Sequence, residues 1–489
     1  MSSQITLTSV LALVPELCLL VLAIVIIFYD RALKPAERRR LGVITGWGVL
    51  VVLLVTFGLW LFLNEPSNQP VLLWGGMIRH DLITLVFRVM FLVAALITAL
   101  ISTDTEELQY GEFYALILMS TIGFNLMAAS GDLIMLYLAL ETASIPLYLL
   151  AGFAKNKERS SEAGMKYFIY GAFASAVMLY GLSFIYGLTN QTNLIGVAQT
   201  ITAQPDAPVL LASVLVIVGF GFKISAVPFH FWTPDVYEGA PAAVTGLVST
   251  ASKAAGFAVF LRVLTAGVFG TVEAAQEWWA MLVAMAIVTM TLGNLLAIWQ
   301  TNIKRMLAYS SIAQAGYTLI GLVTLSVDGT GASMFYLLYY VFSNIAAFAV
   351  IILLSNLVKS DEISDMKGLS RRSPWLGLAM MFALLSLGGI PPTAGFFGKF
   401  FIFKAAVDVG LWWLALIGIL NAFIALYYYL NVIKVMYLYR SDEDEVMIPV
   451  SRAAKVGLAI GMFGIFYLGV LAGPAFEWTR NAAEAFFVG

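Results

Sequence analysis

The chain has 489 residues, of which 61% are hydrophobic and only 11% are charged. A soluble globular protein carries about 25% charged residues, so this composition excludes an ordinary soluble enzyme. The formal net charge of −2 indicates neither a nucleic-acid-binding protein nor a basic membrane-surface protein. The single cysteine, Cys18, cannot form an internal disulfide, and no metal-ligand cluster accompanies it.

Apolar segments follow one another along the whole chain, and they repeatedly reach the roughly 20 residues that cross about 30 Å of hydrocarbon. We therefore expect an all-α integral membrane protein with about fourteen transmembrane helices. No cleavable signal is evident, because residues 1–10 lack Lys and Arg, so we expect the first segment to be retained. The segments lie at about 8–29, 41–63, 83–102, 112–129, 131–154, 164–187, 209–230, 241–265, 277–299, 305–326, 332–356, 374–404, 411–438 and 452–474.

The basic residues between these segments give an independent check, because cytoplasmic loops of membrane proteins hold most of the Lys and Arg. With fourteen crossings, only Arg79 and Arg480 fall on one side of the membrane. The asymmetry supports fourteen crossings and predicts that both ends of the chain face the periplasmic side. The other side holds seventeen basic residues: Arg31, Lys34, Arg38, Arg39, Arg40, Lys155, Lys157, Arg159, Lys304, Arg305, Lys359, Lys367, Arg371, Arg372, Arg440, Arg452 and Lys455.

Eight basic residues fall inside the predicted spans, although a charge at the centre of a spanning helix costs at least about 2.5–3.5 kcal/mol on insertion scales. Lys404, Lys434 and Arg262 lie near helix ends, so we expect them to reach out to the membrane surface. For Arg88 we expect an ion pair or a lipid-headgroup contact. The eight are Arg88, Lys166, Lys223, Lys253, Arg262, Lys399, Lys404 and Lys434.

Four ionisable residues are candidates for a functional role because of their depth. Lys223, Lys253 and Glu141 lie well inside their segments, and Lys166 lies nearer the cytoplasmic end. Ionisable groups at such depth mark ion pathways. The alternative is a static buried salt bridge. Glu16 in the first segment is a weaker candidate.

Helix breakers interrupt two of the segments. The first reads FKISAVPFHFWTPDVYEGAP and the second LGGIPPTAGFFGKF. Proline frees carbonyls in the preceding turn, and an interrupted helix at membrane depth points to an ion pathway. Lys223 precedes the first break by five residues and Lys399 follows the second by seven, so Lys399 joins the candidates. An ordinary proline kink is the alternative.

The two breaks also indicate an internal repeat. Two successive units of five helices necessarily have opposite topology, which gives an inverted repeat. We expect an N-terminal three-helix segment at 1–111, a first repeat of helices four to eight at 112–265, a second repeat of helices nine to thirteen at 266–440 and a last helix at 441–489. The broken helices are then the seventh and the twelfth.

The chain resembles the N-subunit family of bacterial proton-pumping NADH:quinone oxidoreductases (respiratory complex I), whose mitochondrial counterpart is the ND-two subunit. The resemblance covers roughly residues 105–440. It rests on the stretches LALETASIPLYLLAGF, RSSEAGMKYFIYGAFASAVMLYG, GFKISAVPFHFWTPDVYEGAPAAVTGLVSTASKAAGF, GNLLAIWQTNIKRMLAYSSIAQAGY, SLGGIPPTAGFFGKF and LYYYLNVIKVMYL, of which TPDVYEGAP is the specific one.

The resemblance implies an antiporter-like fold and gives each candidate a role. Glu141 resembles the fifth-helix glutamate and Lys166 its sixth-helix partner. Lys223 resembles the central lysine of the broken seventh helix, Lys253 the bridging lysine of the eighth, and Lys399 the exit-side lysine of the twelfth. The sequence departs from the pattern at 314, where many antiporter-like subunits have histidine and this chain has Gln314. Because Gln314 cannot hold a proton at neutral pH, a relay there requires water.

Our hypothesis is that Lys223 loads a proton, Lys253 passes it laterally and Lys399 releases it on the far side. The Glu141–Lys166 pair acts as the switch. The chain has no nucleotide fingerprint, no cysteine cluster and no haem motif. We therefore expect no cofactor in this chain, and NAD, FMN, iron–sulfur clusters and quinone elsewhere in the complex.

The resemblance implies a bacterial inner-membrane location and neighbouring membrane-arm subunits, with the antiporter-like subunit M and the small subunits K and J adjacent. Ferredoxin-driven photosynthetic relatives share the same core, so the electron donor stays open. A subunit of a multi-subunit Na⁺/H⁺ antiporter is a second interpretation. A membrane scaffold that carries no protons is a third.

Overall fold

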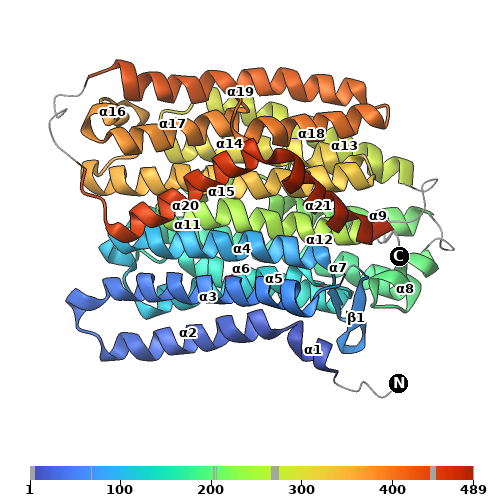
Figure 1. Ribbon diagram of the computed structural model, residues 1–489. Helices are drawn as coiled ribbons and strands as arrows, with labels where there is room; N and C mark the ends of the chain where they lie inside the picture. The colour runs from blue at the N-terminus through green and yellow to red at the C-terminus, as the bar shows by residue number, and fades with distance from the viewer. Residues whose placement is uncertain are drawn as a thin grey trace.

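The computed structural model describes residues 6–67, 69–201, 204, 206–265, 275–440 and 448–487. Long helices lie side by side in one bundle (Figure 1). The only strands among these residues form a short antiparallel hairpin of β1 (Val71–Leu73) and β2 (Ile78–His80). The expected all-α membrane class is confirmed.

The helices follow the apolar segments closely. The N-terminal part forms α1 (Leu7–Leu11), α2 (Val14–Ala32), α3 (Arg39–Leu63), α4 (Leu82–Ile101) and α5 (Gly111–Ala128). The middle part forms α6 (Leu133–Ala151), α7 (Glu158–Thr189), α8 (Leu194–Ile201), α9 (Asp206–Ile224), α10 (Trp232–Gly239), α11 (Ala242–Leu247) and α12 (Lys253–Thr265). The remainder forms α13 (Ala275–Ile298), α14 (Ile303–Val323), α15 (Val327–Val358), α16 (Leu369–Arg372), α17 (Pro374–Gly388), α18 (Ala394–Asp408), α19 (Trp412–Leu438), α20 (Arg452–Val470) and α21 (Ala472–Phe487).

Among the described residues, twelve helices are long and apolar enough to cross a membrane. Two expected segments are not among them. Segment 8–29 became α1 and α2, and α2 carries three charged residues; segment 374–404 became α17 and α18, each of 15 residues. The total of fourteen crossings stays a prediction.

Polar residues mark several helix starts. Asp81, Asp132, Asn302, Ser326 and Ser451 each precede a helix and accept a hydrogen bond from a backbone N–H of its first turn. The first N–H groups of a helix have no partner within the helix, and a short polar side chain at this position satisfies one of them. These caps fix where the hydrophobic runs begin as helices.

The helices form inner and outer layers. The apolar windows of α4 and of Ala242–Leu264 are wholly buried, and those of α14 and α15 are almost wholly buried. Helix α15 packs against α11, α14, α17, α18, α20 and α21, so it is the centre of the C-terminal half. Helices α2 and α19 lie at opposite edges (Figure 1), and large apolar side chains on them stay exposed. Such a surface suits hydrocarbon rather than water.

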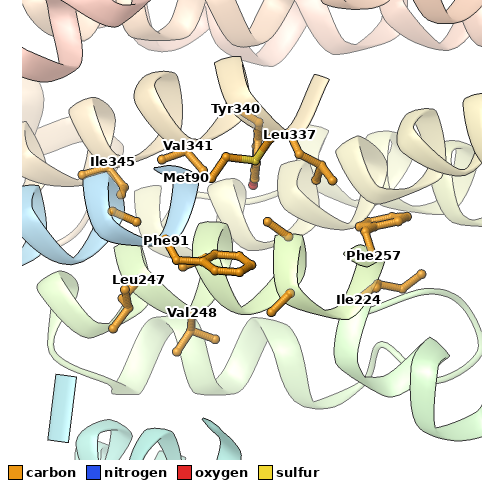
Figure 2. Close-up of a cluster of buried hydrophobic side chains, with 14 of the residues drawn as sticks. Met90, Phe91, Ile224, Leu247, Val248, Phe257, Leu337, Tyr340, Val341 and Ile345 are labelled. Carbon is orange, nitrogen blue, oxygen red and sulfur yellow. The ribbon is translucent and has the colours of Figure 1, made fainter. Parts of the chain in front are cut away.

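The core between the inner helices is apolar. Met90 and Phe91 of α4 face Leu337, Val341 and Ile345 of α15, beside residues of α11 and α12 (Figure 2). Side chains in such a core leave few voids large enough for water. This cluster therefore lies along the bundle as a dry layer.

The helical course is interrupted at both predicted breaker stretches. Helix α9 ends at Ile224 and α10 begins only at Trp232, which donates its indole N–H to the freed carbonyl of Phe222 at 3.2 Å. Helix α17 ends at Gly388, Gly389 has φ of 86°, and α18 begins at Ala394. Glycine suits this left-handed conformation because it has no Cβ.

The orientation of the chain ends agrees with an even number of crossings. Helices α1 and α21 lie at one end of the bundle, and α16, which carries Arg371 and Arg372, lies at the other (Figure 1). Which end faces the cytoplasm stays a prediction, as do the limits of the two repeats.

The expectation for Arg262 was wrong. Its guanidinium does not reach the surface: the residue is 1% exposed and binds both carboxylate oxygens of Asp81, at 2.5 and 2.7 Å. It also donates to the carbonyl of Ala128 at 2.7 and 2.9 Å. The partner comes from the start of α4, 181 residues away, so position within the segment did not reveal it.

Arg88 forms the expected ion pair, with Glu16 at 2.7 Å. Lys404 and Lys434 are exposed.

We predict that Arg262→Ala destabilises the protein by about 3–5 kcal/mol, because it leaves a buried carboxylate short of its main partner. The measurement is thermal denaturation of the detergent-solubilised protein. The control is Lys404→Ala, which removes only an exposed pair with Asp408 and should change stability by less than about 0.5 kcal/mol. Equal melting of both variants would show that the buried pair has no structural role.

Candidate functional site

Lys223 lies in the last turn of α9, directly before the first break, and is 3% exposed. Its Nζ donates to the hydroxyl of Ser144 on α6 at 2.8 Å. Ser144 follows Glu141 by three residues, so both lie on the same face of α6. The carboxylate of Glu141 in turn accepts from the hydroxyl of Ser175 on α7.

A small cavity joins these groups. Ser144, Ser175 and Lys223 line the same space of about 10 Å³, which is roughly what one water molecule needs. Glu141 itself is only half-buried, contrary to the deeply buried position that the sequence predicted. The structure thus brings Glu141 and Lys223 to one site through two serines that the sequence analysis did not single out.

Lys253 begins α12 directly after a π-helical turn at Val248–Ser252 and is 2% exposed. Its Nζ donates to the backbone carbonyl of Ser311 at 2.8 Å and to the hydroxyl of the same residue at 2.9 Å. The ring of Tyr237 lies 5.9 Å from Nζ, which is within the range of a cation–π contact. All of these partners are neutral.

Lys399 lies on α18 after the second break and is 6% exposed. Its Nζ donates to the carbonyls of Leu387 and Gly388 at 3.1 and 2.8 Å, and lies 5.2 Å from the centre of the Tyr317 ring. These two carbonyls end α17, where the helix has no further N–H to offer them. The break therefore supplies the oxygens that hold the ammonium group.

Within the described part of the chain, none of the three buried lysines pairs with a carboxylate within 4 Å. The alternative of a static salt bridge is therefore wrong for Lys223 and Lys253. Lys399, for which the alternative was an ordinary proline kink, is likewise held by neutral oxygens.

Lys166 is different, because it is half-buried and lies in a charged cluster. Its Nζ binds Asp235 on α10 and Glu162 on its own helix, both at 2.7 Å, and does not bind the expected partner Glu141. Asp235 and Glu238 also bind Arg305 of α14, at 2.8 and 2.9 Å. The signal that could have found this cluster is the pair of acidic residues in TPDVYEGAP, directly after the first break.

A larger cavity of about 540 Å³ adjoins the cluster. Its walls carry both signs of charge and come from helix ends and loops that we expect on the cytoplasmic side, with Lys157, Arg159, Glu238, Lys304, Lys359 and Asp361 among them. A space of this size and polarity holds many waters. The cavity therefore gives solvent access to Arg159 and Glu238, at the edge of the Asp235 cluster.

Gln314 of α14 is the centre of a hydrogen-bond network that the sequence did not reveal. Its Nε2 donates to the hydroxyl of Tyr429 and to the carbonyl of Leu387, both at 3.1 Å, and its Oε1 accepts from the hydroxyl of Tyr336. Leu387 is also a partner of Lys399. Tyr429 comes from α19, so only the packing of α19 on the bundle could bring it here.

The model of the NADH:quinone oxidoreductase/Mrp antiporter transmembrane family matches residues 130–425, which include all five candidate residues. A relative named NADH-quinone oxidoreductase subunit N, from Moorella thermoacetica, is 43% identical over 93% of this chain and 94% of its own length. The chain belongs to this family.

Solved structures of the NADH:quinone oxidoreductase/Mrp antiporter family agree. A chain of respiratory complex I from Thermus thermophilus with bound aureothin has a TM-score of 0.79 and 33% identity, covering 95% of this chain and 98% of its own. A chain of the Mrp complex from Dietzia has a TM-score of 0.84 at 22% identity, covering 99% and 98%. The latter likeness shows the fold alone.

We predict that Gly389→Ala disturbs the Lys399 site. Gly389 has φ of 86°, and a Cβ there would lie 2.9 Å from Cδ of Lys399. Gly410→Ala is the matched control, because Gly410 has φ of 85° with nothing within 4 Å of a Cβ. Both variants should lose about 1–2 kcal/mol through the backbone conformation, and only Gly389→Ala should lose about 1–3 kcal/mol more through overpacking. Thermal denaturation of both variants measures the difference, and equal losses would contradict the prediction.

Proposed function

We propose that this chain is the antiporter-like N subunit of an NADH:quinone oxidoreductase and moves protons across the membrane through its buried lysines. The observation that carries the proposal is the set of Lys223, Lys253 and Lys399, each buried and each held by neutral oxygens. Charge at this depth is costly, and groups of this kind in membrane proteins mark ion pathways. The 43% identity to a relative named NADH-quinone oxidoreductase subunit N supports placing this chain in such a complex.

The path starts at Lys223, which takes up a proton from the cytoplasmic side and holds it as an ammonium group against Ser144. Deprotonated Lys253 then accepts the proton through water near the break between α9 and α10. Lys253 passes it across α14 toward Lys399, and Lys399 releases it on the periplasmic side. Each transfer returns the donor lysine to its neutral amine, ready for the next proton.

The switch is the choice that Lys166 has between carboxylates. In this structure Asp235 and Glu162 hold Lys166, so Glu141 is left to stabilise the proton on Lys223. Movement of Lys166 from Asp235 to Glu141 neutralises that carboxylate and weakens the hold on the proton. Because opposite charges attract more strongly in a low dielectric than in water, this exchange of partners frees the proton on Lys223 for the next transfer.

The redox chemistry belongs to other subunits. In this proposal NAD, FMN, iron–sulfur clusters and quinone are bound elsewhere in the complex, and this chain is driven through its contacts with neighbouring membrane-arm subunits, with subunit M and the small subunits K and J adjacent. The location is the bacterial inner membrane, with both chain ends on the periplasmic side. The basic loops at the α16 end support this orientation.

A second candidate is a subunit of a multi-subunit Na⁺/H⁺ antiporter, which the fold of the Mrp chain favours. The identity of 22% is well below the 43% of the subunit N relative. Sodium-dependent proton exchange in membranes that lack the redox subunits would favour this second candidate. A subunit that carries no protons would instead tolerate neutral side chains at all three lysines.

We predict that Lys223→Ala and Glu141→Ala each lower proton pumping by about 10²-fold or more, the loss that accompanies removal of a positioned acid or base. The complex should still assemble, since both side chains sit beside space or solvent. The measurement is NADH-driven acidification of inverted membrane vesicles, with quinone reduction followed in parallel and Lys404→Ala as the exposed control. Normal pumping by both variants would overturn the proposal.

We predict a separate effect for Asp235→Asn, which keeps the size of the side chain but removes the charge that holds Lys166. Lys166 should then pair with Glu141 more often, and the proton on Lys223 should be held less tightly. Pumping should fall several-fold while quinone reduction falls less. Arg159→Gln is the matched control, because among the residues that the structure describes the Arg159 side chain pairs only with Glu238, at 3.3 Å, at the edge of the same cluster. Equal effects of both variants would show that breaking any ion pair of the cluster is enough, and that the release of Lys166 is not the cause.

A further inference from the structure

The proton path described above crosses α14 between Lys253 and Lys399, and no ionisable lysine or histidine of α14 stands there. Lys253 contacts α14 at Ser311, and Lys399 contacts Leu387, which in turn binds Gln314. Ser311 and Gln314 are three residues apart on one helix, so the two lysines approach the same face of α14. What lies on that face decides how a proton passes between them.

Two hydroxyl groups lie beside Gln314, one from Ser310 four residues earlier on α14 and one from Tyr429 of α19. The hydroxyls of Ser310 and Tyr429 are 2.5 Å apart, and either one can be the donor. Ser310 is 1% exposed and Tyr429 is 1% exposed, so this pair is closed to bulk solvent. A short hydroxyl–hydroxyl contact in a dry site is well suited to pass a proton, because each oxygen accepts one proton and releases another.

Gln314 fixes this pair in place but cannot carry the proton itself. Its Nε2 only donates, and it donates both to Tyr429 and to the carbonyl of Leu387 that also binds Lys399. Its Oε1 is held by the hydroxyl of Tyr336. The amide is thus locked on both sides and orients the Tyr429 hydroxyl, with its oxygen toward α14, beside the Lys399 site.

The step between Ser311 and Ser310 needs a bridging water, because neighbouring residues of a helix point in different directions. Partners for such a water are present. The hydroxyls of Tyr237 and Tyr340 are buried and both lie beside the hydroxyl of Ser311. The ring of Tyr237 also lies 5.9 Å from Nζ of Lys253. A water bound at Ser311 has these hydroxyls as further partners, as buried waters need two to four.

We infer that the hydroxyl pair of Ser310 and Tyr429, oriented by Gln314, is the intermediate station of the lateral path between Lys253 and Lys399. The protonated Lys253 gives a proton to the water at Ser311, the hydroxyl pair takes it up and releases its own on the other side, and a second water carries that proton to the neutral amine of Lys399. One proton leaves Lys253 and one arrives at Lys399. Each hydroxyl keeps one proton, but its O–H bond then points the opposite way along the pair. Gln314 is a positioning residue in this scheme. The inference rests on the proposed proton path.

Tyr429→Phe tests the inference, because it removes only one oxygen. In the assembled complex, proton pumping driven by NADH should fall by about tenfold, the effect of losing one ordinary hydrogen bond's contribution to a barrier. The solvent deuterium isotope effect on pumping should rise, since proton transfer at this step becomes slower than the others. A purely structural role for the hydroxyl would not change the isotope effect.

Tyr114→Phe is the matched control. Tyr114 lies on α5, is buried like Tyr429, and among the described residues its hydroxyl has no hydrogen-bond partner on the proposed path. Its loss should leave pumping and the isotope effect unchanged. Rescue gives a second readout: Gln314→His introduces a group that titrates near neutral pH, so it should restore most of the pumping when combined with Tyr429→Phe. If Tyr429→Phe does not assemble, Ser310→Ala removes the other half of the pair and should give the same isotope effect.

Two results separate failure of this inference from failure of the proposed function. If Tyr429→Phe and Ser310→Ala pump normally while Lys253→Ala does not pump, the proton passes by another route and the inference is wrong. If Lys253→Ala and Lys399→Ala also pump normally, there is no lysine path and the proposed function is wrong. If proton pumping falls in Tyr429→Phe and adding Gln314→His does not restore it, the Tyr429 hydroxyl only supports the local packing.

Discussion

An ammonium group inside hydrocarbon must be solvated by the protein itself, and this constraint shapes the centre of the molecule. Water is scarce there, and an unsatisfied charge or backbone group costs several kcal/mol. The chain meets the requirement by ending helices at membrane depth. The end of α17 presents the carbonyls of Leu387 and Gly388 to Lys399, and at the other break the indole of Trp232 satisfies the carbonyl of Phe222. Lys223 and Lys253 bind serine oxygens from neighbouring helices instead.

The buried cations of this protein are of two kinds: arginines that pair with a carboxylate and lysines that bind neutral oxygens. Arg262 is locked by two bonds to Asp81 and by the Ala128 carbonyl, and Arg88 is paired with Glu16. Such pairs hold helices together but keep their protons. The three lysines bind neutral oxygens, so their protons can leave without exposing a carboxylate. The dry cluster of α4, α11, α12 and α15 (Figure 2) lies beside them and limits the routes that water can take through the bundle.

The charged cluster around Asp235 lies at the entrance of the proposed path, and the hydroxyl network around Gln314 lies inside it, between Lys253 and Lys399. The first is a half-exposed set of carboxylates and cations beside a large polar cavity, and Asp235 in it pairs with both Lys166 and Arg305. The second is buried, and Gln314 in it is hydrogen-bonded through both ends of its amide. A half-exposed entrance and a buried interior fit a path in which loading is controlled and lateral transfer is passive. In the proposed scheme Lys166 therefore regulates, and Tyr429 only conducts.

The sequence alone determined the membrane class, the helical segments, the two breaks and the lysines beside them, because hydropathy, proline, glycine and buried charge all act over one helix or less. Only the tertiary structure decided which groups meet. Asp81 lies 181 residues from Arg262, and Tyr429 lies 115 residues from Gln314. Local position predicted a surface contact for Arg262, and the family resemblance implied Glu141 as the partner of Lys166; the structure gave other partners to both. The packing of helices that are distant in the sequence selects those partners. One sequence without relatives to compare does not show which helix packs against which.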